Sequence, residues 1–323
     1  MRDYIIRRLF LMIPTLFVVS VAVFLLVRFI PGDVLDLMVR EHGVQTAGRP
    51  EAAQLDVEAI RSSLGMDVPV HIQYVHWMGG VMRGDLGKSL WSDRSVSEEI
   101  LNRLPVTFEL GLFAFLISQL VAFPVGVYSA IRQDSMGDYI GRSFAILSLA
   151  TPAFWLGTMV MVFPSIWWGW APAATLIPFS EDPLLNLQQF LIPAILMGTA
   201  MSAITMRMLR TTMLEVLRQD YVRTAWSKGL RERIVVTRHA FRNALIPVVT
   251  IVSGQIMVMI GGAVIMEQIF NLPGVGRLFL DSVNRRDYPF IQGINITFAA
   301  IGLLIILAVD LSYAWLDPRV RYR

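Results

Sequence analysis

The segment GDLGKSL, from Gly84 to Leu90, contains the Gly-Lys-Ser triplet found in nucleotide-binding phosphate loops. Such a loop also needs a glycine five residues before Gly87, because its glycines let backbone N–H groups surround the phosphates. Met82 occupies that position. We therefore expect a simple turn here, and we expect the chain to bind no nucleotide through a phosphate loop.

Histidine and nucleophile patterns predict no catalysis in this chain. His71 and His76 are five residues apart and would not share a helix face, while His42 and His239 are isolated. There is no His-Glu-x-x-His, no Gly-x-Ser-x-Gly and no cysteine. These absences exclude the usual zinc protease, serine hydrolase and thiolate sites. The sequence predicts no catalytic residue, no metal site and no cofactor of its own.

Composition places the chain in a membrane. Hydrophobic residues make up 55% of it and charged residues only 16%, with a mean hydropathy of +0.57. Soluble proteins carry about 25% charged residues. The apolar runs lack the period-2 alternation of membrane strands, so the fold class is an all-α integral membrane protein. The net charge of +3 comes from basic residues beside the apolar runs, which argues against nucleic acid as a partner.

Six apolar stretches have the roughly 20 residues that a helix needs to cross the hydrocarbon core. They are Leu9–Ile30, Val106–Tyr128, Ile140–Ser165, Phe190–Leu209, Leu245–Phe270 and Ile294–Leu316. The first is read as an uncleaved span, since no small-residue cleavage site follows it.

Basic residues near the spans predict the orientation, because cytoplasmic loops are enriched in lysine and arginine. Both termini are arginine-rich, and 207–242 holds nine Lys/Arg residues, whereas 167–189 holds none. Both termini are therefore expected in the cytoplasm. The loop 271–293, with three arginines, is the exception to this pattern.

The chain divides into three regions on this interpretation. Residues 1–30 form the cytoplasmic N-terminus and first span, 31–105 form an external subdomain, and 106–323 form a five-span core with a cytoplasmic loop at about 210–245. Within the external subdomain we expect short helices at Val57–Gly65 and Pro69–Met82. Ser95 and Glu98 have the spacing of a capping box at the start of the next helix.

Three carboxylates in the spans are candidates for structural or gating roles, because ionisable groups in lipid are costly. Glu109 and Glu267 lie within about a turn of the expected outer surface, and Asp310 lies deeper. We expect Asp310 to face protein, with Arg207 or Arg210 as its partner. None sits at the midplane, where a proton-coupled carrier would need it.

The stretch after the fourth span predicts an amphipathic helix in the cytoplasmic loop. Its apolar stripe comprises Tyr221, Val222, Ala225, Trp226 and Gly229. The opposite face comprises Arg223, Thr224, Ser227 and Lys228. Gly229 fits the position after a helix C-terminus, and a second amphipathic helix is expected at about 233–245. Such helices suit either a partner's groove or the bilayer surface.

The same stretch resembles the signature cytoplasmic loop of ABC importer permeases, whose general form is Glu-Ala-Ala-x-x-x-Gly. Here Arg223 and Thr224 replace the first two residues, while Ala225 and Gly229 match. That departure resembles the dipeptide/oligopeptide/nickel branch, which has Tyr-x-Arg-Thr-Ala-x-x-Lys-Gly. Further similar segments are Arg28–Asp33, Gly84–Leu90, Arg103–Leu110, Arg238–Thr250, Asn271–Val283, Arg286–Gly293 and Asp310–Tyr322.

The resemblance implies a type I ABC importer fold and a B-type permease subunit in a bacterial or archaeal cytoplasmic membrane. It implies a second permease subunit, two cytoplasmic ATPases that hold ATP and Mg²⁺, and an external solute-binding protein. The ATPase-coupling residues would be Tyr221, Arg223, Thr224, Ala225, Lys228, Gly229 and Leu230. Peptides are the first expected solute, with oligosaccharides, glutathione and nickel chelates as alternatives. A stand-alone secondary carrier or channel is the rival interpretation.

Overall fold

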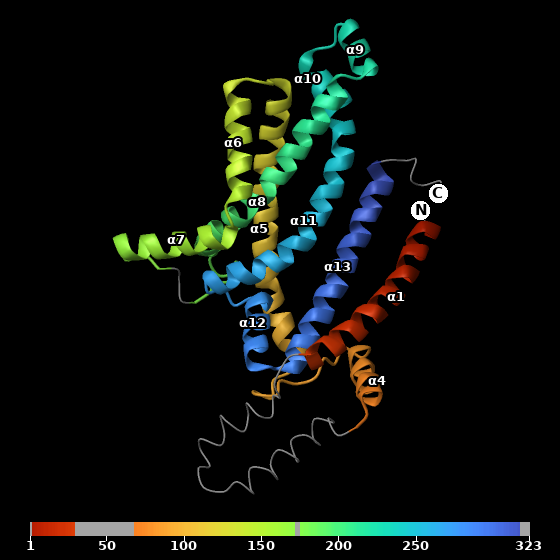
Figure 1. Ribbon diagram of the computed structural model, residues 1–323, viewed down its shortest axis with the longest axis vertical. Helices are drawn as coiled ribbons and strands as arrows, with labels where there is room; N and C mark the ends of the chain where they lie inside the picture. The colour runs from red at the N-terminus through yellow and green to blue at the C-terminus, as the bar shows by residue number, and fades with distance from the viewer. Residues whose placement is uncertain (1, 30–67, 172–174, 317–323) are drawn as a thin grey trace, which may run out of the picture. The chain divides into compact units, whose positions relative to one another are not determined.

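The computed structural model describes the backbone of residues 2–29, 68–171 and 175–316 (Figure 1). The helix expected at Val57–Gly65 lies outside these residues. Every named element in the described part of the chain is helical. Five helices are long and apolar enough to cross a membrane, and a bent pair of helices is a sixth candidate. The described residues therefore have the expected all-α fold.

The chain forms two compact units, which are described separately. The first comprises residues 1–6, 104–277 and 304–323, and the second comprises 7–103 and 278–303. In this division, residues 278–303 group with the N-terminal segment.

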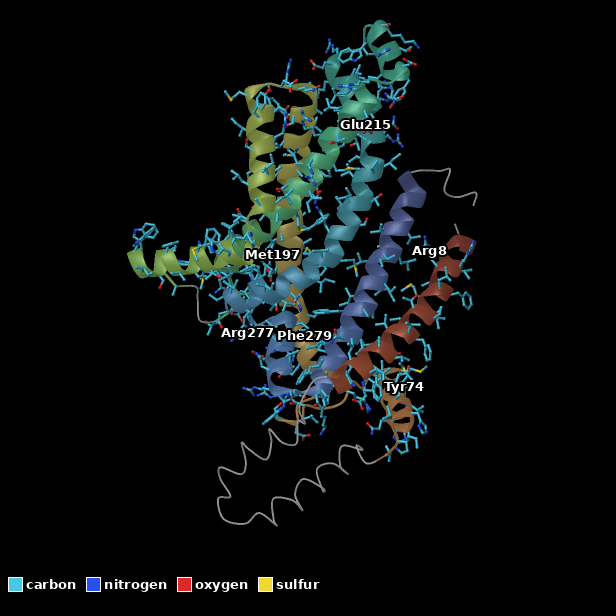
Figure 2. The ribbon with its side chains drawn as sticks, viewed as in Figure 1. Arg8, Tyr74, Met197, Glu215, Arg277 and Phe279 are labelled. Carbon is cyan, nitrogen blue, oxygen red and sulfur yellow. The ribbon has the colours of Figure 1, made fainter. Side chains whose placement is uncertain are left out.

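The first unit is built around α8 (Pro183–Leu217), with α5 (Val96–Ile131) and α11 (Arg242–Ile269) as neighbours. Its main core joins Leu110, Phe190 and Met266, and Met197, labelled in Figure 2, belongs to it. A Cβ on Gly198 would lie 2.7 Å from the carbonyl oxygen of Ala114. Small residues of this kind let membrane helices approach closely.

The third span is broken, so the expected continuous helix over 140–165 is wrong. The chain forms α6 (Met136–Ala150) and α7 (Ala153–Trp168), which are bent by 88°. Pro152 has no N–H and forces the preceding residue out of the helical region. Thr151 accordingly has φ −102° and ψ 119°. Pro152 therefore ends one helix and begins another inside an apolar run that was expected to form a single span.

Helix ends elsewhere extend beyond the expected spans. Asp182 caps α8 by accepting hydrogen bonds from the backbone N–H groups of Leu184 and Leu185 at 3.0 and 3.1 Å. Ser95 Oγ accepts one from Glu98 N at 3.4 Å at the start of α5, as the capping box predicts. The N-terminal helix α1 covers Arg2–Leu26, and α13 covers Tyr288–Leu316.

In the second unit, α4 (Val70–Val81) confirms the helix expected after Pro69. Its Tyr74 shares a hydrogen bond of 2.8 Å with Ser20 of α1 and packs edge-on against Phe24 at 5.3 Å. Gln73 of α4 accepts a hydrogen bond from Arg28. The helix α12 (Val275–Arg285) begins in the first unit and continues in the second.

Candidate functional site

The helix expected in the cytoplasmic loop is α9 (Asp220–Ser227), followed by the short α10 (Glu232–Ile234). Both lie beyond the ends of α8 and α11 (Figure 1). Gly229 has φ +75°. Gly229 N donates to Trp226 O at 2.9 Å, and Leu230 N donates to Ala225 O at 3.4 Å. This pair of bonds is a Schellman cap, which needs a left-handed residue at the glycine position.

The apolar face of α9 packs on its own chain. Val222 and Ala225 are buried and form a cluster with Val235. Val216, Leu217 and Leu230 surround that cluster. Leu230 is the residue after the capping glycine, and a hydrophobic contact there usually accompanies this type of cap.

The expected apolar stripe is wider than the buried one. Tyr221 and Trp226 were predicted to share the apolar face, yet each is 44% exposed. Their side chains lie at the margin of a narrow face, because Val222 and Ala225 alone fill the contact with Val235. Two aromatic rings therefore remain available on the surface of α9, next to its basic face.

Tyr221 is fixed by a polar contact that sequence reasoning missed. Its hydroxyl accepts a hydrogen bond from Asn243 Nδ2 at 2.8 Å, and Asn243 also donates to His239 O at 3.1 Å. Asn243 lies in the first turn of α11. No spacing rule links Tyr221 to Asn243, since the contact depends on how the chain turns back after α9.

The second helix expected at about 233–245 is present, and it is continuous with the fifth span. Residues Val235–Phe241 form a π-helical segment that runs directly into α11. The stretch from Glu232 to Ile269 is therefore one candidate span. Val235, Val236 and Ala240 are buried while Arg233, Thr237 and Arg238 are exposed, so the segment is amphipathic as expected.

The remaining residues predicted to couple to an ATPase lie on the outside of α9. Arg223, Thr224 and Lys228 are exposed. Arg223 lies 3.5 Å from the carboxylate of Asp220 in an exposed pair, and such pairs contribute little to stability. Nothing in the described residues covers these side chains.

A buried ion pair joins α6 to α8, and it was not predicted. Arg210 donates to both carboxylate oxygens of Asp138, from Nε at 2.8 Å and from Nη2 at 2.7 Å. The Asp138 side chain is fully buried, and that of Arg210 is 16% exposed. Asp134 N also donates to Asp138 at 3.0 Å. This bidentate geometry is the stronger form of an arginine–carboxylate contact.

The pair changes the interpretation of Asp310. Arg210 was a proposed partner for Asp310, but its guanidinium engages Asp138 through both bonds. Asp310 lies in α13, and its side chain is outside the described residues. The pair was missed because Asp138 had been assigned to a cytoplasmic loop rather than to the first turn of α6.

Glu109 and Glu267 differ in burial. Glu109 of α5 is half-buried and lies beside Asn186 of α8. Glu267 of α11 is fully buried, and its carboxylate accepts hydrogen bonds from Thr107 Oγ1 at 2.6 Å and from Arg277 N at 2.9 Å. Figure 2 labels Arg277. Thr107 Oγ1 also accepts from Val275 N at 2.9 Å.

Glu267 and Thr107 therefore satisfy backbone N–H groups in the first turn of α12. A helix leaves its first N–H groups without partners within the helix, and a carboxylate there is favoured by the helix dipole. Of the two roles expected for Glu267, structural or gating, this arrangement supports the structural one.

We predict that Gly274→Ala destabilises the protein by about 2 kcal/mol or more. A Cβ at Gly274 would lie 2.2 Å from the Glu267 carboxyl carbon, so the carboxylate must move and lose charge-assisted hydrogen bonds. Thermal or detergent unfolding of the purified chain measures this. Gly254→Ala is the control, because nothing lies within 4 Å of its Cβ and alanine favours a helix. Equal stability of the two variants would contradict the prediction.

In the second unit, the turn with the Gly-Lys-Ser triplet holds a buried carboxylate. Ser89 Oγ donates to Asp287 at 2.5 Å, and Leu90 N donates to it at 3.2 Å. Trp91 Nε1 donates to Arg285 O at 2.9 Å. The serine that suggested a phosphate loop therefore binds a carboxylate of the same chain. Burial raises the pKa of Asp287, while its hydrogen bonds with Ser89 and Leu90 oppose that rise.

This pKa predicts a pH dependence of stability. Because the folded-state pKa is above the ordinary aspartate value of about 3.9, the folded state binds the proton more tightly than the unfolded state. The stabilising contribution is complete below the unfolded pKa and is lost as pH rises through the folded pKa. The slope of melting temperature against pH across this window should therefore be more negative in the unmodified chain than in Asp287→Asn. An unchanged slope in the variant would exclude Asp287 as its source.

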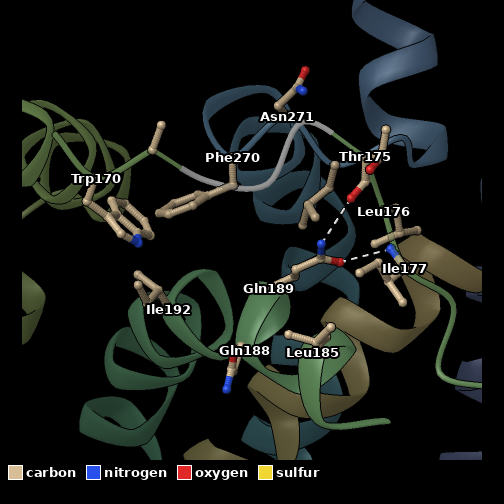
Figure 3. A pocket seen from close by; sticks show the side chains of 12 residues that line it. Trp170, Thr175, Leu176, Ile177, Leu185, Gln188, Gln189, Ile192, Phe270 and Asn271 are labelled. Atoms are coloured by element: carbon tan, nitrogen blue, oxygen red, sulfur yellow. Dashed lines mark hydrogen bonds between the residues drawn. The ribbon is translucent and has the colours of Figure 1, made fainter. Parts of the chain in front are cut away.

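A cavity of about 200 Å³ lies between the start of α8, the chain after α7 (170–171 and 175–177) and the turn that follows α11 (270–272) (Figure 3). Gln189 crosses one side of it, donating to Thr175 O at 3.0 Å and accepting from Ile177 N at 3.1 Å. Trp170, Ile192 and Phe270 also line it. Ligand pockets usually measure roughly 300–1,000 Å³, so this cavity is too small to hold a whole peptide.

Within the described residues there is no group of three or more His, Cys, Asp or Glu side chains that could hold a metal ion. The carboxylates of Asp138, Glu267 and Asp287 are engaged by arginine, hydroxyl or backbone N–H groups. The arrangement comprises spanning helices with buried polar anchors and one short helix that presents a basic, aromatic surface.

Two comparisons with known proteins cover the whole chain. The chain is 39% identical over 323 residues to the glutathione transport system permease protein GsiC of Pectobacterium atrosepticum, covering 100% of both chains. It is 38% identical over 347 residues to the dipeptide transport system permease protein DppB of Escherichia coli (strain K12), again covering 100% of both.

The family comparison agrees with these relatives. Residues 122–322 match the binding-protein-dependent transport system inner membrane component, and residues 1–111 match the N-terminal region of such components. The chain therefore belongs to the family of binding-protein-dependent transport system inner membrane components, the permease subunits of ABC importers.

Proposed function

We propose that this chain is one half of the membrane pathway of an ATP-driven importer of peptides, including glutathione. The observation that carries this proposal is full-length similarity to permeases named for dipeptide and glutathione transport. Glutathione is itself a small peptide, so both names share one solute chemistry. Family membership removes the rival interpretation of a stand-alone secondary carrier or channel.

ATP and Mg²⁺ bind partner subunits in this proposal, and the chain contributes only a docking surface. The support is the shape of α9, whose apolar residues are buried against its own chain. Its exposed Arg223, Thr224 and Lys228, with Trp226 beside them, remain for a partner. Ala225, Gly229 and Leu230 hold the conformation of that surface, whereas Tyr221 both contacts Asn243 and stays partly exposed beside it.

A second permease subunit and an external solute-binding protein complete the proposed assembly. A polar cavity of about 320 Å³ in the second unit supports the contact with the binding protein. It is lined by Arg94, Arg103 and Arg285 together with Glu99 and Asp281. Charges of both signs at a rim favour specific, transient association over tight binding.

The function is tested by reconstitution. The chain is co-expressed with its second permease and ATPase subunits, and the complex is placed in vesicles with the binding protein. ATP-dependent uptake of a labelled dipeptide or of glutathione is expected. If the vesicles take up an oligosaccharide or a nickel chelate but neither peptide, the proposed solute class is wrong. Isolation of the chain without any ATPase under mild conditions would overturn the coupling.

The proposed topology has the termini and α9 in the cytoplasm and the 31–105 segment outside. Arg83→Cys and Arg231→Cys each add the sole cysteine to a cysteine-free chain, and both positions are exposed. A membrane-impermeant maleimide should label Arg83→Cys in cells with a permeable outer barrier. It should label Arg231→Cys only after the membrane is dissolved. The reverse pattern would invert the topology.

A further inference from the structure

A small cavity of about 130 Å³ lies between α6 and α8, apart from the coupling helix. Three arginines line it, Arg142 from α6 and Arg207 and Arg210 from α8. Ile146 and Leu149 of α6 line the same cavity. Both helices belong to candidate membrane spans, so this is a basic site on a surface that borders lipid.

The cavity carries more positive charge than its acids neutralise. Arg210 is bound through two hydrogen bonds to Asp138. Arg142 and Arg207 are exposed, and no ion pair is formed by either with a carboxylate of the described residues. Arg142 lies 5.6 Å from the centre of the Tyr139 ring. Asp134 and Asp138 are the acids whose charges reach this group.

Two arginines on spanning helices that form no ion pair with the described residues need an explanation. A charged side chain facing hydrocarbon costs a few kcal/mol unless it reaches the interface or finds a partner. Long side chains can reach the headgroup level, and Arg142 lies in the second turn of α6, close to the helix end. Below them in the same cavity are apolar side chains, of which Ile146 is 66% exposed and Leu149 is 39% exposed.

We propose that this cavity binds an anionic phospholipid. Arg142 and Arg207 bind the headgroup phosphate, and an acyl chain lies along Ile146 and Leu149. Guanidinium groups suit phosphate because their fork of N–H donors matches two phosphate oxygens. Basic pockets between membrane helices on the cytoplasmic side bind such headgroups. The combination of a basic rim and exposed apolar residues distinguishes a lipid from a free anion.

The bound lipid spans the contact between α6 and α8, on the same helices as the Asp138–Arg210 pair. α8 ends at Leu217, and two residues separate it from α9. An anionic lipid is therefore expected to hold the broken third span against the helix that leads to the coupling segment. None of the α9 residues proposed for the ATPase contact lines this cavity.

The test compares the full-length chain with Arg142→Gln/Arg207→Gln in detergent micelles. Dioleoyl phosphatidylglycerol is added, and native mass spectrometry counts retained lipid while melting is followed in parallel. Each arginine near an anionic surface contributes roughly fivefold in affinity, so the double variant should bind phosphatidylglycerol about 25-fold more weakly. Arg142→Lys/Arg207→Lys should bind more tightly than the glutamine variant, because charge is kept, but less tightly than the unmodified chain, because lysine lacks the fork of donors.

The control Arg132→Gln/Arg218→Gln removes two exposed arginines that lie outside the cavity, and it should bind phosphatidylglycerol as the unmodified chain does. Phosphatidylcholine and inorganic phosphate should not raise the melting temperature. Equal losses in both double variants would show a non-specific charge effect and overturn the site. If inorganic phosphate alone stabilises the chain, the cavity binds a free anion and the proposal of a lipid is wrong. If Arg142→Gln/Arg207→Gln fails to fold, the two single variants give the same comparison.

Discussion

Replacing Gly229 by valine is expected to reduce ATP-driven uptake at least about tenfold while the complex still assembles. Gly229 has φ +75°, and nothing lies within 4 Å of a Cβ built there. The cost of the substitution therefore comes from the backbone conformation and not from a clash with neighbouring atoms. A left-handed conformation costs an L-residue roughly 1–2 kcal/mol, and more for a β-branched one. The cap would open, and Leu230 would leave the Val222–Ala225–Val235 cluster.

Two substitutions separate this effect from general destabilisation. Gly229→Asn should retain most uptake, because asparagine tolerates the left-handed region. Gly169→Val imposes similar strain at φ +63° with open space around its Cβ, but it lies at the end of α7. It should leave ATP hydrolysis coupled to uptake. If Gly229→Val transports normally in vesicles, the cap has no part in coupling.

Arg210→Met is expected to lower the free energy of unfolding by about 3–5 kcal/mol, because it leaves the buried carboxylate of Asp138 without its partner. Reversible unfolding in mixed micelles of a zwitterionic detergent and sodium dodecyl sulfate measures the change. Arg207→Met removes an exposed arginine one turn away and should change stability by no more than about 0.5 kcal/mol.

The double variant Asp138→Leu/Arg210→Met sharpens the interpretation. Replacing both members of a buried pair with apolar residues is often neutral, so most of the lost stability should return. If the double variant is as unstable as Arg210→Met, the loss comes from packing around the Arg210 stem. A small effect of Arg210→Met alone would mean that water or lipid compensates Asp138.

Sequence patterning predicted the helical membrane class and the approximate positions of five spans, because apolar runs of this length have few alternatives. It failed at Pro152, where one residue decides between a kink and a break. Neighbouring helices determine that outcome, and α7 packs against both α8 and α11. The π-helical segment Val235–Phe241 was missed for a similar reason, since its apolar residues are buried by tertiary contacts.

The candidate coupling site was predicted in part. The positive φ of Gly229 follows from its place after an amphipathic helix, and the structure confirms it. The exposure of Tyr221 and Trp226 was not predictable, because the partner of the apolar face was unknown. The polar anchors Asp138–Arg210 and Thr107–Glu267 join residues far apart in sequence, so no local spacing indicated them.

The helix α9 contacts the ends of two spans, so a force applied to α9 would act on both of them. Val222 and Ala225 tie the helix to the end of α8 through Val216 and Leu217, while Tyr221 ties it to the start of α11 through Asn243. Beyond Pro193, α8 continues to Leu217, and at 1.5 Å per residue this part is roughly 36 Å long. In the proposed coupling, a small tilt at the cytoplasmic end of α8 would become a displacement of several ångströms at the other end of this length.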